Sequence, residues 1–263
     1  MNLGIKNRVA LITGGSKGIG FASAISLAKE GCNIGLLSRN KDSLETAVNH
    51  LREKFKIKCI GIIGDVSNKD MPQIAIDKMM SEFAQVDILV NNSGGPPAGL
   101  FHEKNEEDWS SALNLNLLSA IRFCKLIYPI MEKNSYGRII NILSLLAKEP
   151  NSNMVLSATS RAGLIAFTKS ISNDLGPRGI TINNICPGGV MTDRLKNLLE
   201  SAASKLNISY EEHFANRVNT VPLGRFADPS EIGDLVAFLA SEKAGFITGT
   251  SIIADGGQSR GIY

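Results

Sequence analysis

Short, almost uninterrupted apolar runs alternate along this chain with longer segments in which apolar residues recur every three or four positions. The short runs are rich in β-branched residues and have the length of buried strands. They cover residues 8–13, 33–38, 58–63, 86–92, 137–143, 179–185 and 251–255. Because both faces of these runs are apolar, the strands are expected to lie in a sheet that helices cover on both sides. This alternation, with right-handed crossovers, predicts an α/β fold: a doubly wound parallel sheet of about seven strands.

Two helix ends are marked by the sequence itself. Asp228 has the position of an N-cap, Pro229 is the first helical residue, and Glu231 completes a capping box. Gly176 is expected to end an earlier helix, and Pro177 prevents that helix from continuing.

One segment departs from the alternation of strands and helices. Residues 191–220 are polar and helical in pattern, and they stand between the last two predicted strands. An insertion at this place in a doubly wound sheet lies beside the ligand crevice, so the segment is expected to be a helical lid. No repeat, low-complexity tract or linker interrupts the chain, and residues 1–263 are therefore predicted to form a single domain.

Composition and charge narrow the class of partner. Of the 263 residues, 43% are hydrophobic and 20% are charged, and 28 basic against 25 acidic side chains give a net charge of +3. This weak, mixed charge indicates no nucleic-acid partner and no membrane partner. The N-terminus lacks a signal-peptide cleavage site and no apolar run is long enough to span a bilayer, so a cytoplasmic location is expected.

The candidate metal ligands are scattered. The 4 cysteines include no Cys-x-x-Cys pair and are expected to be reduced, buried thiols. The 3 histidines are also far apart in the sequence. No metal site is expected.

The first predicted strand leads directly into a glycine-rich turn, "VALITGGSKGIG", and then into a helix. Gly14, Gly18 and Gly20 allow the backbone to approach a pyrophosphate closely. The helix N-terminus adds unpaired N–H groups and the positive end of its dipole. In this strand–turn–helix context, the glycines predict a dinucleotide site.

The spacing Gly-x-x-x-Gly-x-Gly after a threonine resembles the short-chain dehydrogenase/reductase family, and the resemblance extends over almost the whole chain. Three more motifs carry it: "GDV" at 64–66, "CPGGVMT" at 186–192, and "NNSG" at 91–94, where the family has alanine in place of Ser93. The family resemblance implies a single Rossmann-type domain. It also implies a cofactor site formed by Gly14, Ser16, Lys17, Gly18, Ile19, Gly20, Ser38, Arg39, Asp65, Val66, Asn92, Ser93, Gly94, Arg161, Pro187, Gly188, Val190 and Thr192.

The end of the second predicted strand favours NADP(H) over NAD(H). NAD sites hold the ribose 2′-hydroxyl with an acidic residue there, but this chain has Ser38 followed by Arg39. A guanidinium can bind a 2′-phosphate through two hydrogen bonds, whereas a carboxylate would repel it. Lys17, within the glycine loop, adds a second cation.

Members of this family use an asparagine, a serine, a tyrosine and a lysine for catalysis. The resemblance assigns the asparagine, which holds a proton-relay water, to Asn116, with Asn114 as the less favoured register. It assigns the serine that binds the substrate oxygen to Ser144. The tyrosine and lysine positions, four residues apart, are occupied by Ser157 and Arg161.

This replacement is not a shift of register, because no tyrosine in the chain is followed four positions later by a lysine. Reduction of a carbonyl needs a proton donor for the developing alkoxide, and a serine hydroxyl is a far weaker acid than tyrosine, whose pKa is about 10. Arg161 is no acid, but it can anchor the nicotinamide ribose and stabilise an oxyanion. Loss of a general acid costs roughly 10²- to 10⁴-fold in rate, so slow reduction can survive.

The pattern resembles a divergent branch of the family, similar to 3-oxoacyl-acyl-carrier-protein reductases but without the tyrosine and lysine.

Two other residues are candidate proton donors. Lys148 lies four residues beyond Ser144, on a loop expected to line the substrate crevice, and burial can lower the pKa of a lysine. Tyr210 lies in the expected lid. Ser157 itself is expected to be mainly a residue of a helix N-terminus, a place that suits serine.

Three functions remain open at this point. The first is an NADP(H)-dependent oxidoreductase that acts on a small carbonyl, alcohol or 3-oxoacyl-like substrate through this atypical active site. The second is an NADP(H)-binding protein without turnover, a redox sensor or an assembly partner. The third is a non-redox lyase or hydratase using the same site. The resemblance also implies a homotetramer, with a homodimer as the alternative.

Overall fold

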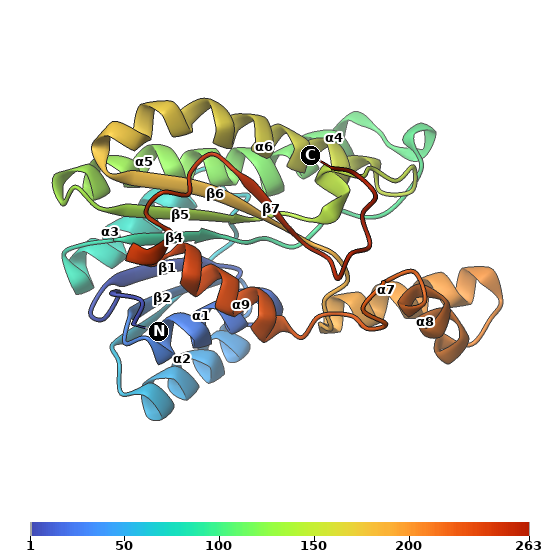
Figure 1. The fold of residues 1–263 in the computed structure, drawn as a ribbon, viewed down its shortest axis with the longest axis horizontal. Coiled ribbons are helices and arrows are strands. Elements are labelled where there is room, and N and C mark those ends of the chain that lie inside the picture. Colours follow the sequence, from blue (N-terminus) through green and yellow to red (C-terminus); the bar gives the residue numbers. More distant parts are fainter. Residues whose placement is uncertain (1, 263) are drawn as a thin grey trace.

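The fold is built on one parallel sheet. The structure, a computed structural model, describes residues 2–262, and within them seven strands pair in the order β3-β2-β1-β4-β5-β6-β7 (Figure 1). The strands are β1 (Val9–Thr13), β2 (Asn33–Ser38), β3 (Cys59–Ile63), β4 (Ile88–Asn91), β5 (Gly137–Ile142), β6 (Ile180–Pro187) and β7 (Ser251–Ala254). The predicted fold is confirmed, and each strand ends within about two residues of the predicted run. The strand order reverses beside β1, where ligands bind in folds of this class.

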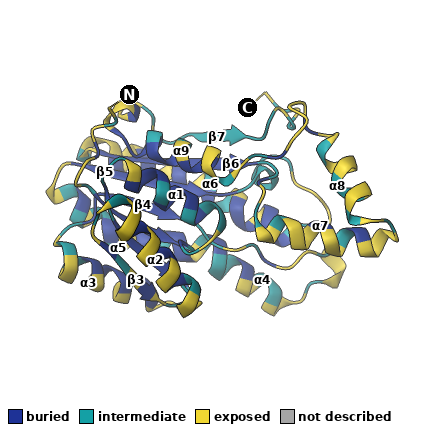
Figure 2. Ribbon diagram, turned by 90° about the horizontal axis from the view of Figure 1, so that it is seen from below, coloured by how far each residue is buried: buried dark blue, intermediate teal, exposed yellow. Residues whose placement is uncertain are grey.

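Helices cover both faces of the sheet (Figure 1). One face packs against α1 (Gly18–Lys29), α2 (Lys41–Phe55) and α9 (Pro229–Leu239), and the other against α3 (Met71–Phe83), α5 (Ser119–Lys133) and α6 (Val155–Leu175). Each interface has its own apolar core, and Figure 2 shows the buried residues concentrated along the strands and the inner sides of these helices. This burial explains why the strand runs are apolar on both faces.

The remaining helical segments lie outside these two layers. They are α4 (Glu106–Leu113), the π-helical turn η2 (Asn114–Leu118), α7 (Asp193–Leu206), α8 (Tyr210–Val218), and the 3-10 turns η1 (Phe101–Glu103), η3 (Leu145–Ala147), η4 (Gly176–Arg178) and η5 (Glu242–Ala244).

The helix-end predictions hold with one refinement. At α9, the carboxylate of Glu231 accepts the N–H of Asp228 at 2.8 Å, which confirms the capping box. Helix α6 ends at Leu175, as Gly176 predicts, but the chain then continues through η4. The left-handed residue is Gly179, with φ of 76°, and a Cβ there would lie 2.4 Å from the carbonyl oxygen of Ser135. Gly179, rather than Gly176, therefore makes the turn into β6.

A ladder of polar side chains crosses the buried sheet, which the apolar pattern does not predict. Asn91, Asn141, Asn184 and Ser251 occupy paired positions on β4, β5, β6 and β7. Asn91 donates to Asn141 at 2.8 Å, Asn141 to Asn184 at 3.0 Å, and Asn184 to the Ser251 hydroxyl at 2.9 Å. Thr168, from α6, joins the middle of the ladder by bonds to both Asn141 and Asn184. Each amide therefore pairs with its neighbour in register, and the ladder fixes the alignment of four strands.

Helices α7 and α8 fall in the range 191–220 and extend beyond the end of the sheet (Figure 1). They enclose a small apolar cluster of their own, in which Tyr210 and Phe214 pack beside the buried Leu199, Val221 and Phe226. The helical character of this insertion is as expected, and its action as a lid stays a prediction.

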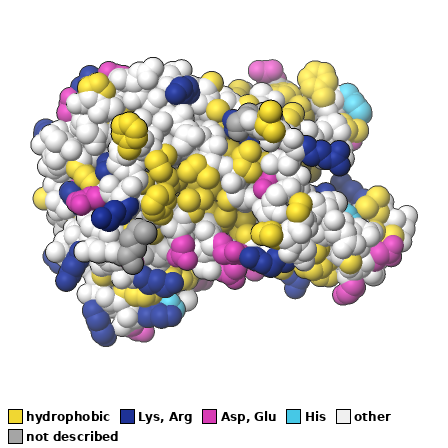
Figure 3. Space-filling view, in the orientation of Figure 1, with side chains coloured by type: hydrophobic (Ala, Val, Ile, Leu, Met, Phe, Trp, Pro, Cys, Tyr) yellow, Lys and Arg dark blue, Asp and Glu magenta, His cyan; other side chains and the backbone are white. Residues whose placement is uncertain are grey.

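Surface features add little about partners. Among residues 2–262, no helix is long and apolar enough to cross a membrane. No group of three or more His, Cys, Asp and Glu side chains gathers as a metal site in that same range. Figure 3 shows an apolar patch on the face where β7 and α9 lie, with charged side chains mainly around it. The homotetramer stays a prediction.

Candidate functional site

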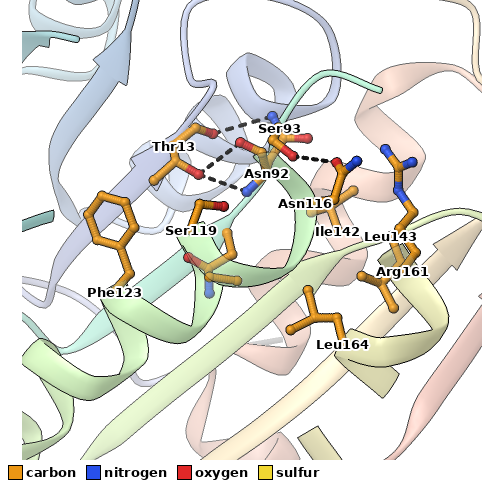
Figure 4. A pocket seen from close by; sticks show the side chains of 12 residues that line it. Thr13, Asn92, Ser93, Asn116, Ser119, Phe123, Ile142, Leu143, Arg161 and Leu164 are labelled. Atoms are coloured by element: carbon orange, nitrogen blue, oxygen red, sulfur yellow. Dashed lines mark hydrogen bonds between the residues drawn. The ribbon is translucent and has the colours of Figure 1, made fainter. Parts of the chain in front are cut away.

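The candidate site lies where the carboxyl ends of the central strands meet. A pocket there is lined by Thr13 from the end of β1, Ser93 after β4, Asn116 from η2 and Arg161 from α6 (Figure 4). Residues separated by almost 150 positions in the sequence thus face one space. The parallel sheet produces this arrangement because all of its strands point their carboxyl ends to the same edge.

The glycine loop has the geometry of an anion site. Gly14 and Gly18 have φ of 58° and 54°, a left-handed conformation that favours glycine. A Cβ on Gly20 would lie 2.3 Å from the carbonyl oxygen of Gly14, so no larger residue fits. In the described structure, no side chain caps the N-terminus of α1, and no acidic residue stands in its first turn. The first N–H groups of α1 are therefore available to a ligand's phosphates.

The glycine loop is held by the turn after β4. The Thr13 hydroxyl donates to the carbonyl oxygen of Asn92 at 2.8 Å and accepts from its N–H at 2.9 Å. The Asn92 amide in turn donates to the carbonyl oxygens of Thr13 and Gly14, at 3.3 and 3.1 Å. The side chain of Asn92, predicted to bind cofactor, thus braces the loop. Thr13 was not among the predicted site residues, although the threonine before the glycines was a visible signal.

The end of β2 carries no acidic residue. The Ser38 hydroxyl lies 2.7 Å from that of Ser16, and Arg39 extends into solvent with a side chain that is 77% exposed. Arg39 pairs with Asp65 at 3.4 Å. Burial raises the pKa of Asp65, but hydrogen bonds from Ser67 and the charge of Arg39 outweigh it and hold the pKa below its usual value. Asp65 is therefore ionised at neutral pH and orients Arg39 at the rim of the site.

Asn116 is fixed at both ends of its amide. Its Oδ1 accepts from the Ser93 hydroxyl at 2.9 Å, and its Nδ2 donates to the Ser160 hydroxyl at 3.4 Å. Asn114 instead accepts from Arg122 at 3.0 Å. Asn116 lines the pocket and Asn114 is not among its lining residues, and the catalytic role of Asn116 stays a prediction. An alanine at position 93 could not form the first of these bonds.

Ser144 begins the turn η3, and Lys148 ends it. The Ser144 Oγ accepts from the N–H of Leu146 at 3.2 Å, so its own proton is available to a substrate oxygen. Lys148 is half-buried. Burial raises the pKa of the Cys186 thiol to about 11, and the charges of Lys148 and Arg161 oppose that rise. Both cations therefore lie within electrostatic reach of the end of β6.

Ser157 and Arg161 contact each other inside the protein. Ser157 is 2% exposed, and its Oγ accepts a hydrogen bond from the Arg161 guanidinium. Ser157 lies in the first turn of α6, but the N-cap is Met154, so the serine is not a capping residue. Burial, followed by the charge of Arg194, lowers the pKa of Arg161 to about 10. Arg161 still carries its charge at neutral pH, in surroundings that contain little water.

The other predicted cofactor residues take different positions. The side chains of Val66 and Val190 are buried in the apolar cores and Ile19 packs on one of them, so their contact with a ligand would be mainly through backbone. A Cβ added to Gly94 would meet nothing within 4 Å, so this glycine faces open space. Gly188 donates its N–H to the carbonyl of Ala254 at 3.0 Å, directly after Pro187.

Thr192 and Tyr210, both in the insertion, differ in position. Thr192 caps α7 and packs against the glycine loop, since a Cβ on Gly18 would lie 3.2 Å from its methyl group. Thr192 therefore stands beside the start of α1, and its contact with a cofactor stays a prediction. The Tyr210 ring packs on Phe214 with 5.9 Å between ring centres, in the cluster of α7 and α8.

Comparison with known proteins gives the class of this chain. A family model described as "Enoyl-(Acyl carrier protein) reductase" matches residues 14–259. The chain belongs to this family of short-chain dehydrogenases/reductases, as its glycine loop and strand order indicate.

Similar individual proteins are reductases. The chain is 33% identical over 259 residues to the 3-oxoacyl-[acyl-carrier-protein] reductase FabG of Chlamydia muridarum, across 98% of this chain and 100% of the relative. It is 34% identical over 259 residues to the NADPH-dependent reductase BacG of Bacillus subtilis, with the same coverage. The solved structure of L-sorbose reductase from Gluconobacter frateurii, complexed with NADPH and L-sorbose, is similar with a TM-score of 0.95 and 30% identity over 100% of both chains.

Proposed function

We propose that this chain is an NADP(H)-dependent oxidoreductase acting on a small carbonyl compound or the corresponding alcohol. The observation that carries the proposal is the convergence of an open anion site with Asn116, Ser144 and Arg161 at one edge of the sheet. The similar proteins, an acyl-carrier-protein reductase and two reductases whose names mention NADPH, support both the reaction class and the cofactor.

The residues present fit NADP(H). The N–H groups at the start of α1 would hold the pyrophosphate, and the open space at Gly94 would admit the rest of the dinucleotide. Arg39, whose side chain is mostly exposed, would pair with the 2′-phosphate in addition to or in place of Asp65. When bound, this cofactor supplies the hydride.

The chain's own groups would act on the substrate oxygen. The Ser144 hydroxyl donates a hydrogen bond to that oxygen, and the Arg161 charge stabilises the negative charge that develops on it. Reduction of a carbonyl to an alcohol takes up one hydride and one proton. Arg161 is assigned the stabilisation of this charge, and the proton reaches the alkoxide from the Ser157 hydroxyl, from Lys148, or from water near them.

The substitution of tyrosine and lysine by Ser157 and Arg161 favours a second candidate, a protein that binds NADP(H) without turnover. The Ser157 hydroxyl is already engaged by Arg161 and is a weak acid. A hydride-transfer site that has lost its proton donor keeps cofactor affinity while it loses rate. The lyase or hydratase hypothesis would use the same residues, with the cofactor held but not consumed.

One experiment separates these functions. Purified protein is titrated with NADPH and NADH by fluorescence, and NADPH oxidation is followed against ketones, diketones, oxo acids and β-ketoacyl thioesters. Turnover on any of them supports the reductase. Lys148→Met and Tyr210→Phe are then compared, and we expect a loss of at least 10-fold in kcat only for Lys148→Met. Tight binding with no turnover favours the second candidate, and no binding of either nucleotide overturns the proposal.

A further inference from the structure

Two arginines at the candidate site have no acidic partner. Arg161 is only 7% exposed and donates to Ser157, and within residues 2–262 neither it nor Arg194 forms an ion pair. Arg8 and Arg225 are paired with Asp87 and Glu231, and the buried Arg138, which also has no carboxylate partner, donates to the backbone carbonyls of Gly137 and Ser241 instead. A buried cation without a carboxylate is costly, so its retention calls for a reason.

Arg194 is placed over the site by a glycine. It is the second residue of α7, and a Cβ on Gly95 would lie 2.4 Å from its Nη2. Gly95 belongs to the turn after β4, the same turn that supplies Ser93 to the pocket. Any side chain at position 95 would displace the guanidinium. Arg194 is exposed, and its charge adds to burial in lowering the pKa of Arg161, so the two cations lie within electrostatic reach of each other.

A neutral ligand would leave this repulsion in place. The nicotinamide ribose offers hydroxyl groups to Arg161 but no negative charge, and the oxidised nicotinamide is itself positive. An anion between the two guanidinium groups would relieve their repulsion and satisfy donors on both. The anion must come with the substrate, because the cofactor's phosphates are accounted for at α1 and Arg39.

We propose that the substrate is a small oxo acid whose free carboxylate binds Arg194 and whose carbonyl oxygen faces Arg161. This inference rests on the proposed reductase function and adds a substrate class to it. It differs from a neutral sugar and from an acyl thioester, which carry no charge beside the reacting carbonyl. Arg194 is then a residue for specificity, and Arg161 is the residue beside the reacting oxygen.

The test compares each oxo acid with its own methyl ester. Pyruvate and methyl pyruvate, and acetoacetate and methyl acetoacetate, are assayed with wild type, Arg194→Ala, Arg194→Lys and Arg217→Ala. We expect kcat/KM at least 10-fold higher for the acids with wild type. In Arg194→Ala, kcat/KM falls about 100-fold for the acids and less than 3-fold for the esters. Arg194→Lys retains part of the wild-type preference for acids over esters. Arg217, an exposed arginine of α8, is the matched control, and we expect Arg217→Ala to leave kcat/KM unchanged for the acids and for the esters.

An equal loss for acids and esters in Arg194→Ala, or a wild-type preference for the esters, would overturn the oxo-acid assignment while the reductase function stands. If no substrate turns over, the reductase proposal fails and the anion site is tested by binding alone. Thermal shifts of the ligand-free protein are then measured with 3-hydroxybutyrate and with its methyl ester. A shift with the acid only, abolished in Arg194→Ala, supports the site; no shift at 10 mM overturns it.

Discussion

At the scale of single residues, Arg161 is a buried charge at the position for which the family resemblance predicts a lysine. Burial lowers its pKa well below the usual arginine value, to about 10, so the folded protein holds this proton less tightly than the unfolded chain does. Below about pH 10 the side chain is charged in both states, and the full penalty, on the order of 3 kcal/mol, is present. This penalty is relieved only as the pH rises above about 10.

Arg161→Met should therefore stabilise the ligand-free protein. We expect the free energy of unfolding to rise by about 1–3 kcal/mol, because the charge is removed and the chain length is kept. The gain should be constant from pH 6 to 9, and kcat should fall at least 100-fold. Urea denaturation at several pH values gives the first quantity, and a variant that unfolds more easily than wild type would contradict the argument.

Arg39 offers a test of cofactor choice at a residue outside the reacting centre. In Arg39→Asp, a carboxylate at the end of β2 repels a 2′-phosphate and can accept a bond from a 2′-hydroxyl. We expect the Kd for NADPH to rise at least 10-fold and the Kd for NADH to fall or stay unchanged. Fluorescence titration measures both, with Lys41→Asp, an exposed position at the start of α2, as the charge-matched control. If NADPH binding weakens equally in Arg39→Asp and Lys41→Asp, the effect comes from the change in net charge and not from a contact of Arg39 with the 2′-phosphate.

At the scale of elements, the paired asparagines decide how well the strands keep their register. Asn141 stands in the middle of the ladder and bonds to both neighbouring asparagines and to Thr168. Asn141→Leu has a similar volume, but it removes the bonds to Asn91, Asn184 and Thr168. The Asn91 amide then keeps only the sulfur of Cys124, at 3.7 Å, as a partner. Each orphaned group costs about 1–3 kcal/mol, so we expect a loss of about 2–4 kcal/mol.

The control for this variant is Asn49→Leu, an exposed position of α2 that should change stability by less than about 0.5 kcal/mol. Denaturant unfolding compares the two. If Asn141→Leu unfolds at the same concentration as wild type, the ladder contributes nothing to stability.

The elements also explain which features the sequence could predict. Strand runs, the Asp228 cap and the glycine loop are local patterns, and the structure has all of them where the pattern predicts. The bond from Ser93 to Asn116, the contact of Arg194 with Gly95, and the register of Asn91 with Asn141 join distant positions. These contacts depend on how distant strands and loops meet in the fold, and the local spacing of apolar residues carries no information about that. Ser93, where the family resemblance predicts alanine, could be noticed in the sequence. The sequence did not show that Asn116 is its hydrogen-bond partner.

On the scale of the whole molecule, cofactor binding should couple to stability. A ligand that binds only the folded state raises the free energy of unfolding by about 2.7 kcal/mol when its concentration is 100 times its Kd. For a chain of this size each kcal/mol raises the Tm by ~2–4 °C, so we expect a shift of ~5–10 °C. Differential scanning fluorimetry with NADPH and with NADH at equal concentration measures it. A larger shift with NADH would contradict the assignment of Arg39 to the 2′-phosphate.

The strand order also has a consequence for how the chain is made. After β1 to β3 have paired, β4 joins the free edge of β1, and β5, β6 and β7 then each join the strand before them in the sequence. A ribosome therefore delivers every one of these strands to a neighbour that already exists, and no strand must be inserted between two others. The nucleotide-binding half can assemble early, while the edge that receives the next strand stays exposed until synthesis moves on. Arg161 is encoded after β5 and Arg194 after β6, so the two charges that we propose act on the substrate are added after the first five strands.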